Sequence, residues 1–332
     1  MKNTKNTKNT KNMIEAEGLT KNYGEVVAVD HIDIEVASGE IFGFLGPNGA
    51  GKTTTVRMLT GIIRPTRGRV RIAGFDLRRD PIKAKEVMGV VPELSNAYNG
   101  LSAWRNLQLM AELYGVPAKD AKARAEELLV RFGLHDRKDH RTKTFSKGMK
   151  QRLVIAMSLM SDPEILFLDE PTSGLDVLSA RMIKEVLREL NNEGKTIFLT
   201  THYMEEANQL CNRVAIINHG KIAAVDSPEK LKARMGGLGR VEVSFDTPVD
   251  SSDLRRLSGV TDVRASGDKT YLYTDEPGRT IQHLVDCCRS GGMEIVTLNT
   301  LTPTLEDVFI KLTGDGEVSV GDANALEGAA NK

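Results

Sequence analysis

The chain is poor in cysteine, which excludes the classes of site that depend on thiols. Its 332 residues include only Cys211, Cys287 and Cys288. None of the three has the Cys-x-x-Cys or Cys/His spacing of a zinc site, and three cysteines do not suggest a disulfide framework. Cys288 continues an apolar stripe at helical spacing, which favours a role in core packing.

Charge of one sign and long apolar runs are also missing. The 45 basic and 45 acidic residues cancel, so the whole-chain charge gives no support for a nucleic-acid or membrane-surface binder. No apolar run approaches the roughly 18 residues that span a bilayer, and the N-terminus lacks the apolar core of a signal peptide. We therefore expect a protein that stays in the cytoplasm. Its length favours about two domains, and 40% of apolar residues is enough for a core.

What the chain does contain is a glycine-rich loop between a strand and a helix. Residues 41–45 form an apolar run typical of a buried parallel strand, and apolar residues recur at helical spacing after the loop. Glycines allow close approach of phosphate oxygens, and the N-terminus of the helix presents unpaired N–H groups to the same anion. The Gly-x4-Gly-Lys-Thr spacing predicts a phosphate-binding loop formed by Gly46, Pro47, Asn48, Gly49, Ala50, Gly51, Lys52, Thr53 and Thr54.

Each polar residue of this loop has an expected role. Lys52 should reach the β- and γ-phosphates, and the hydroxyl of Thr53 is a suitable hard-oxygen ligand for Mg²⁺. Thr54 can add a phosphate contact. The alternative is a glycine-rich turn that binds nothing, and the agreement of strand, spacing and helix argues against it.

Polar residues end two further apolar strands. Asp169 and Glu170 follow the strand predicted at 165–168, and His202 follows the strand at 196–201. Ligands of open α/β sheets bind at the carboxyl ends of the strands. We therefore expect Asp169 to hold Mg²⁺ opposite Thr53, and Glu170 to orient and deprotonate an attacking water. His202 could sense a γ-phosphate, although a lone acid pair or histidine at a strand end is often only structural.

The remaining segments have less specific signals. Glu93 ends another buried strand, at 87–92. Tyr23 lies between two strands upstream of the loop, where it could stack on a purine or simply pack. Residues 96–160 change to helical periodicity, and Ser146 has the position of an N-cap before the last helix of this insertion.

The C-terminal region has a pattern of its own and no catalytic constellation. Its predicted order resembles a ferredoxin-like split βαβ arrangement, with a strand at 240–246, a helix at 251–257, strands at 259–265 and 269–274, a helix at 278–290, a strand at 293–298 and a helix at 303–312. Residues 1–12 form a polar, basic repeat, and residues 314–332 are rich in glycine, alanine and acids. We expect both tails to be disordered, and a start at Met13 instead of Met1 would remove the first.

Assembled in this order, the motifs from residue 13 to about 235 resemble the nucleotide-binding subunit of an ABC transporter. Gly46 to Thr53 match the Walker A motif, Leu166 to Asp169 with Glu170 match Walker B and its catalytic glutamate, Ser173 to Asp176 match the D-loop, His202 matches the switch histidine, and Tyr23 falls at the position of the adenine-stacking aromatic. The resemblance implies an α/β P-loop NTPase fold for residues 13–235, with a helical subdomain at about 96–160, followed by a C-terminal α+β accessory domain at 236–313.

Two departures from the family motifs narrow the resemblance to one branch of the family. The signature Leu-Ser-Gly-Gly-Gln reads Phe145-Ser146-Lys147-Gly148-Met149 here, and Glu93 replaces the glutamine of the Q-loop. Both variants, together with the C-terminal segment 301–313, are similar to the branch of exporters served by ABC-2 type permeases, which includes the daunorubicin-resistance ATPases. We hypothesise that Glu93 contacts the metal or the attacking water and communicates with the permease.

The resemblance also implies partners. Two copies of the chain would enclose ATP and Mg²⁺, because Ser146 and the Gly148 N–H of one copy would complete the γ-phosphate site of the other. A separately encoded membrane permease would bind this dimer at the cytoplasmic face of the membrane and would select the transported substrate, which this chain does not reveal.

The alternatives are a soluble ABC ATPase that acts on nucleic acid or ribosomes without a permease, and a nucleotide-dependent regulatory binder. No second nucleotide domain, long coiled coil or zinc site supports the former, and Glu170 and His202 argue against the latter.

Overall fold

The computed structural model describes residues 12–93, 97–234, 239–247, 249, 251–291, 293–301 and 303–313. Residues 1–11 and 314–332, for which the sequence predicts disorder, lie outside the described residues. Asn12, predicted as the end of the first tail, is instead the first residue of a strand. Tertiary contacts divide the chain into two compact units, with the boundary in the sequence between Pro228 and Glu229.

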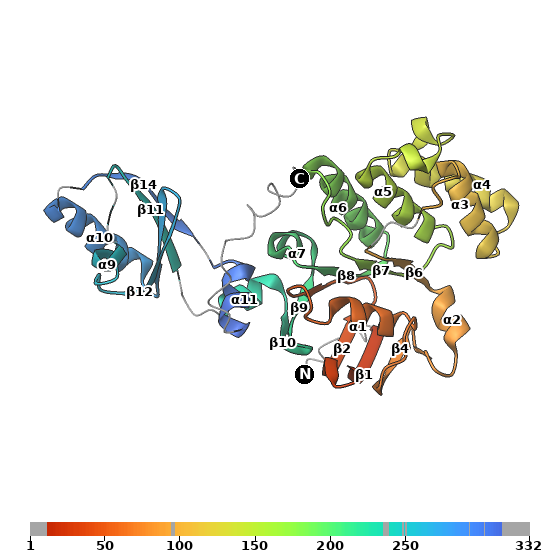
Figure 1. The fold of residues 1–332 in the computed structure, drawn as a ribbon, viewed down its shortest axis with the longest axis horizontal. Coiled ribbons are helices and arrows are strands. Elements are labelled where there is room, and N and C mark those ends of the chain that lie inside the picture. Colours follow the sequence, from red (N-terminus) through yellow and green to blue (C-terminus); the bar gives the residue numbers. More distant parts are fainter. Residues whose placement is uncertain are drawn as a thin grey trace, which may run out of the picture. The chain divides into compact units, whose positions relative to one another are not determined.

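The first unit contains two sheets (Figure 1). One is antiparallel with the order β2-β1-β4-β5, formed by β1 (Asn12–Tyr23), β2 (Val26–Ala37), β4 (Arg67–Ile72) and β5 (Phe75–Asp76). The other has the order β10-β9-β3-β8-β7-β6, formed by β3 (Ile41–Leu45), β6 (Met88–Val91), β7 (Ile165–Asp169), β8 (Thr196–Thr201), β9 (Arg213–Asn218) and β10 (Lys221–Asp226). Its strands are parallel except for the β9–β10 hairpin.

The central strands β3, β7 and β8 are buried at every position, which explains the apolar runs at 41–45, 165–168 and 197–199. The ring of Phe198 lies 5.7 Å from each of the rings of Phe42, Phe44 and Phe167, so one aromatic side chain joins three strands. The helix α1 (Lys52–Leu59) contacts β2 and β4 of the first sheet and β7 of the second. This arrangement fixes the loop before α1 at the carboxyl end of β3.

The predicted helical insertion is confirmed. It contains α3 (Ala103–Leu113), α4 (Ala118–Arg131), the 3-10 turns η1 (His135–Arg137) and η2 (Thr142–Thr144), and α5 (Lys147–Ser158). Figure 1 shows α3, α4 and α5 gathered together, away from the antiparallel sheet. The remaining helices of the unit are α2 (Pro81–Glu86), α6 (Val177–Asn192) and α7 (Met204–Leu210). In α6 the apolar residues Ile183, Val186, Leu187 and Leu190 are buried, whereas Leu178 in the first turn is 78% exposed.

The second unit is a small α+β domain, and α8 (Pro228–Ala233) falls largely within it. Its antiparallel sheet has the order β12-β13-β11-β14, as the predicted split βαβ arrangement requires. The elements are β11 (Gly239–Phe245), α9 (Ser251–Leu254), β12 (Val260–Ser266), β13 (Lys269–Thr274), α10 (Pro277–Gly291), β14 (Ile295–Leu301) and α11 (Leu305–Thr313). The helix predicted at 251–257 is therefore too long. Cys288 packs in the core of this unit, as its spacing predicts.

No helix of the described residues is both long enough and apolar enough to cross a membrane.

Candidate functional site

The glycine-rich loop joins β3 to α1, and its positions require glycine for different structural reasons. Gly49 and Gly51 have φ angles of 82° and 108°, which L side chains rarely adopt. A Cβ atom on Gly51 would also lie 2.6 Å from the carbonyl oxygen of Ala28. At Gly46 the reason is crowding, because a Cβ atom there would lie 2.4 Å from the carbonyl oxygen of Ile217 in β9. The loop thus needs glycine for its own packing as well as for the approach of a ligand.

The N-terminus of α1 is left open by this loop. Its N-cap residue, Gly51, has no side chain that could accept a hydrogen bond, and the first turn of the helix contains no acid. The first N–H groups of a helix have no partner within the helix and favour an anion. A cavity of about 390 Å³ lies at this point, lined by Ala28, Pro47, Asn48, Gly49, Gly51, Lys52, Thr53, Thr54, Glu93 and Glu170.

Lys52 and Glu170 form a buried pair in this cavity. Their side chains are 6% and 7% exposed, and Lys52 Nζ lies 3.2 Å from Glu170 Oε1. The ammonium group donates hydrogen bonds to the carbonyl oxygens of Gly46 and Pro47, at 2.7 and 3.1 Å. Glu170 Oε1 itself has no hydrogen-bond partner with suitable geometry, although it is buried. Such an oxygen is costly to bury, so it indicates a position that a ligand group can occupy.

The other oxygen of Glu170 faces His202. Glu170 Oε2 lies 2.8 Å from His202 Nδ1, so the two strand-end residues predicted to share a site do meet. Glu170 has a φ angle of 50°, an uncommon conformation for a residue with a side chain. Backbone strain of this kind often accompanies a functional position. It turns the chain sharply at the residue after β7.

Thr200, near the end of β8, contacts both Asp169 and Glu170. Thr200 Oγ1 donates a hydrogen bond of 2.6 Å to Asp169 Oδ1 and accepts one of 3.0 Å from the backbone N–H of Glu170. Its neighbour Thr201 donates to Glu206 in α7, at 2.9 Å, and Thr172 donates to the other oxygen of the same glutamate, at 2.7 Å. Sequence reasoning missed these residues. The only available signal was the pair of polar residues at the end of an otherwise apolar strand.

Glu93 and Tyr23 differ in their relation to the cavity. Glu93 is exposed and lines the cavity together with Thr53 and Glu170. Tyr23 is the last residue of β1 and is 47% exposed, with the ammonium group of Lys21 5.1 Å from the centre of its ring. Neither Tyr23 nor Asp169 is among the described residues that line the cavity. Asp169 lies one residue before Glu170 and is buried.

Ser146 and Gly148 lie at the start of α5, and the described lining of the loop cavity does not include them. Ser146 caps this helix as predicted, since its Oγ accepts a hydrogen bond from the N–H of Met149 at 3.3 Å. Gly148 packs tightly against α6, where a Cβ atom would lie 2.3 Å from Ser179 Oγ. Asp176 caps α6, and hydrogen bonds from the N–H and hydroxyl of Ser179 keep the pKa of its carboxyl below the ordinary value.

Comparison with known proteins covers most of this chain. The model of the ABC transporter family matches residues 29–173, and that of the C-terminal domain of DrrA1-3-like ATP-binding proteins matches residues 227–313. The chain is 38% identical over 306 residues to the daunorubicin/doxorubicin resistance ATP-binding protein DrrA of Streptomyces peucetius, covering 91% of this chain and 92% of that protein. It is also 38% identical over 304 residues to the Nod factor export ATP-binding protein I of Ralstonia nicotianae, covering 91% and 94%.

A solved structure shares the fold of the first unit. It is the dimeric structure of an ATP-binding cassette in a post-hydrolysis state, bound to ADP and Pi, and it is 26% identical with a TM-score of 0.60 over 65% of this chain and 98% of that chain. The chain belongs to the family of ABC transporter ATP-binding proteins, in the branch of the DrrA-like drug-resistance and Nod factor export ATPases, and is an ATP-hydrolysing subunit of an ABC exporter.

Proposed function

We propose that two copies of this chain enclose ATP and drive a separate ABC-2 type permease. The observation that carries the proposal is the buried carboxylate of Glu170, which contacts Lys52 through one oxygen and His202 through the other, beside the open N-terminus of α1. A buried cation, a carboxylate with one oxygen that has no hydrogen bond, and helix N–H groups without a partner in the helix suit the transfer of a phosphoryl group to water.

In this proposal the backbone N–H groups from Gly49 to Thr54 hold the phosphates, together with the ammonium group of Lys52. Phosphate oxygens would replace the loop carbonyl oxygens that Lys52 now contacts. Glu170 accepts a proton from the attacking water, and His202 orients the carboxylate through its hydrogen bond to Oε2. Thr200 keeps the backbone of Glu170 in place. Tyr23 is proposed to stack on the adenine, since this residue is 47% exposed.

The donors for Mg²⁺ fit this arrangement. Thr53, Asp169 and Glu93 supply hydroxyl and carboxylate oxygens, which Mg²⁺ prefers. The described residues contain no cluster of three or more metal-ligating side chains, and Mg²⁺ sites of nucleotide enzymes use one or two protein ligands together with the phosphates. When bound, the ion would supply positive charge to the β- and γ-phosphates.

The second copy completes the site. Ser146 and Gly148 begin α5, whose first turn contains no acid, so this helix N-terminus can also receive a phosphate. We propose that it faces the phosphate loop of the other copy, as a dimer of the kind formed by the ADP-bound relative would allow. ATP would then stabilise the closed dimer, and hydrolysis would release it.

The permease and the transported molecule follow from the relatives only as proposals. Relatives in this branch confer daunorubicin resistance or export Nod factor, and a more distant relative, cbiO1 of Clostridium perfringens, is part of a transporter complex. We propose an exporter subunit at the cytoplasmic face of the membrane, with substrate choice made by the permease. Residues 236–313 would act as an accessory domain. These relatives favour an exporter over an ATPase acting on nucleic acid or ribosomes.

Glu170→Gln tests the proposed chemistry. The amide keeps the size of the side chain but cannot accept the proton of water, so phosphate release should fall by a factor of about 10² to 10⁴. ATP should still join two copies, which size-exclusion chromatography with and without ATP would detect. Full turnover by this variant would refute the role of Glu170, and a variant that stays monomeric with ATP would count against the dimer.

A further inference from the structure

A second cavity of the first unit lies at the other end of α1, away from the phosphate loop. It has a volume of about 490 Å³, within the usual range of small-molecule sites. The last turn of α1, the loop that follows it, β4, the segment after β5, and α2 form its walls. Nothing in the proposed ATP site involves these residues.

The floor of the cavity is apolar. Met58 and Val70 are 1% and 4% exposed and belong to the core of the unit, and the partly buried Leu77 packs against that core. These side chains offer a hydrocarbon or aromatic group a surface that is shielded from water.

Three exposed cations line the same cavity. They are Arg64, Arg78 and Lys85, and no acid is among the described lining residues. Among the acids nearest in sequence, Asp76 accepts hydrogen bonds from the N–H groups of Arg78 and Arg79, and Asp80 pairs with Lys83 at 3.3 Å. Glu86 follows Lys85 in the chain but is not among the described lining residues. In the part of the chain that the structure describes, the side chains of Arg64, Arg78 and Lys85 have no hydrogen-bond or ion-pair partner. Three positive charges around one cavity attract an anion.

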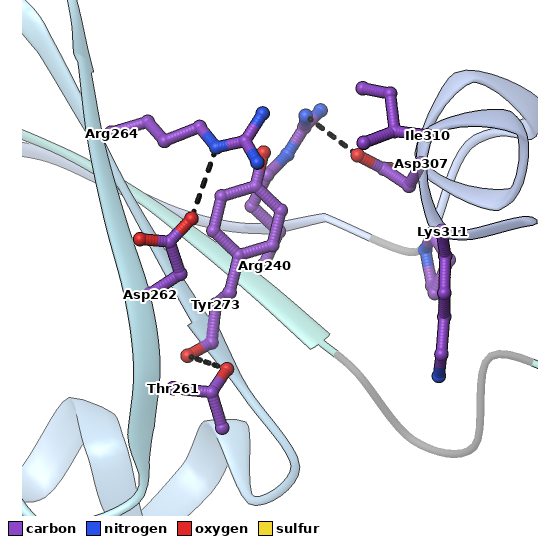
Figure 2. Close-up of a pocket in the computed structure, with 9 residues that line it drawn as sticks. Arg240, Thr261, Asp262, Arg264, Tyr273, Asp307, Ile310 and Lys311 are labelled. Carbon is purple, nitrogen blue, oxygen red and sulfur yellow. Dashed lines mark hydrogen bonds and ion pairs between the residues drawn. The ribbon is translucent and has the colours of Figure 1, made fainter. Parts of the chain in front are cut away.

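The pocket in Figure 2, in the second unit, shows why pairing matters. It is also lined by cations, but Arg264 Nε lies 3.1 Å from Asp262 Oδ2, and Arg240 lies 3.7 Å from Asp307. Acids within the pocket therefore neutralise most of its positive charge. The cavity at the end of α1 has no such acids.

We propose that the cavity lined by Met58, Val70, Leu77, Arg64, Arg78 and Lys85 binds a small amphipathic anion, in which an apolar chain or ring carries one sulfonate, carboxylate or phosphate group. The apolar part lies against Met58, Val70 and Leu77, and the anionic group lies among the three cations. This site is separate from the phosphate loop and does not depend on the proposed mechanism.

The test uses 8-anilinonaphthalene-1-sulfonate as the probe, in fluorescence titrations of the full chain with saturating ADP present. The variant combines Arg64→Gln, Arg78→Gln and Lys85→Gln. Each lost charge contact at an exposed site is worth about two- to fivefold in affinity, so the combined variant should bind the probe about ten- to a hundredfold more weakly. Arg79→Gln is the matched control, because Arg79 neighbours Arg78 but does not line the cavity, and its titration should stay within twofold of the parent chain.

Two further measurements complete the test. The neutral N-phenyl-1-naphthylamine should bind the parent and the combined variant equally. Octyl phosphate should displace the probe if the natural anion is a free molecule, and phosphatidylglycerol vesicles should retain the parent but not the variant if it is a lipid headgroup. Phosphate release by the variant confirms that it is folded. Equal sulfonate titrations of parent and combined variant, or no saturable binding of the sulfonate by the parent chain with ADP present, would overturn the proposal.

Discussion

The two units of the chain each place ionised side chains beside a sheet, but under different conditions. In the first unit Lys52 and Glu170 are 6% and 7% exposed. In the second, Arg264 and Asp262 are 45% and 43% exposed, and their hydrogen bond faces the pocket of Figure 2. The distances within the two pairs are similar, at 3.2 and 3.1 Å.

The comparison shows that burial, not the number of ion pairs, marks the functional cluster. Removing a charge from water costs several kcal/mol, and a buried pair returns this cost only when its geometry is good. In addition, the buried Oε1 of Glu170 has an ion-pair contact but no hydrogen bond of suitable geometry, and the backbone of Glu170 is strained. An exposed pair such as Arg264 and Asp262 costs little and contributes about 0 to 1 kcal/mol. The proposed role in ATP hydrolysis would explain why the first pair is buried, whereas the exposed second pair needs no explanation beyond local structure.

The largest expected effect is that of Lys52→Ala. The change removes the ammonium group that contacts both the loop carbonyls and Glu170, so nucleotide binding should weaken about 100-fold or more and turnover should fall to background. Equilibrium binding of a fluorescent ATP analogue and phosphate release measure the two effects. Arg264→Ala is the control in the second unit and should change turnover less than about twofold. Similar losses in both variants would contradict the comparison.

His202→Ala should have the next largest effect. Loss of the contact with Glu170 Oε2 leaves the carboxylate free to rotate, so kcat for ATP should fall by a factor of about 10² to 10³. The phosphate loop is unchanged, and the affinity for ATP should therefore stay within about threefold. Steady-state phosphate release over a range of ATP concentrations separates kcat from KM. A rise in KM with unchanged kcat would show that His202 serves binding instead.

Much of the first unit could be predicted from the sequence because its signals are local. The apolar strand before Gly46, the glycine spacing and the acids after residue 168 each indicate one element, and parallel strands bring their ends together. The contact of Thr172 with Glu206 could not be predicted, since it joins residues that are 34 positions apart in the chain. Neither could the packing of Gly148 against Ser179, which depends on how closely α5 and α6 approach.

Gly148→Ala turns that packing into a test of stability. The added methyl group would lie 2.3 Å from Ser179 Oγ and 2.7 Å from Ser179 Cβ, so the free energy of unfolding should fall by about 1 to 3 kcal/mol. Urea unfolding measures the change. Adding Ser179→Gly removes both close contacts and should recover most of the loss. If the double variant regains stability but not ATP turnover, Gly148 has a role at the phosphate in addition to its packing; if stability is not regained, the close contact is not the cause.

The smallest expected effect is at a glycine of the second unit. Gly278 lies in the first turn of α10, its φ angle is not in the left-handed region, and no atom would lie within 4 Å of an added Cβ. Gly278→Ala should therefore raise the free energy of unfolding by about 0.4 to 1 kcal/mol, because it restricts the unfolded chain without strain in the folded one. Urea unfolding followed by a probe of the second unit measures this, and ATP turnover should be unchanged. Opposite signs for the same substitution at Gly148 and Gly278 would show that close packing, and not helix propensity, sets the requirement for glycine in α5. A loss of stability at Gly278 would remove that distinction.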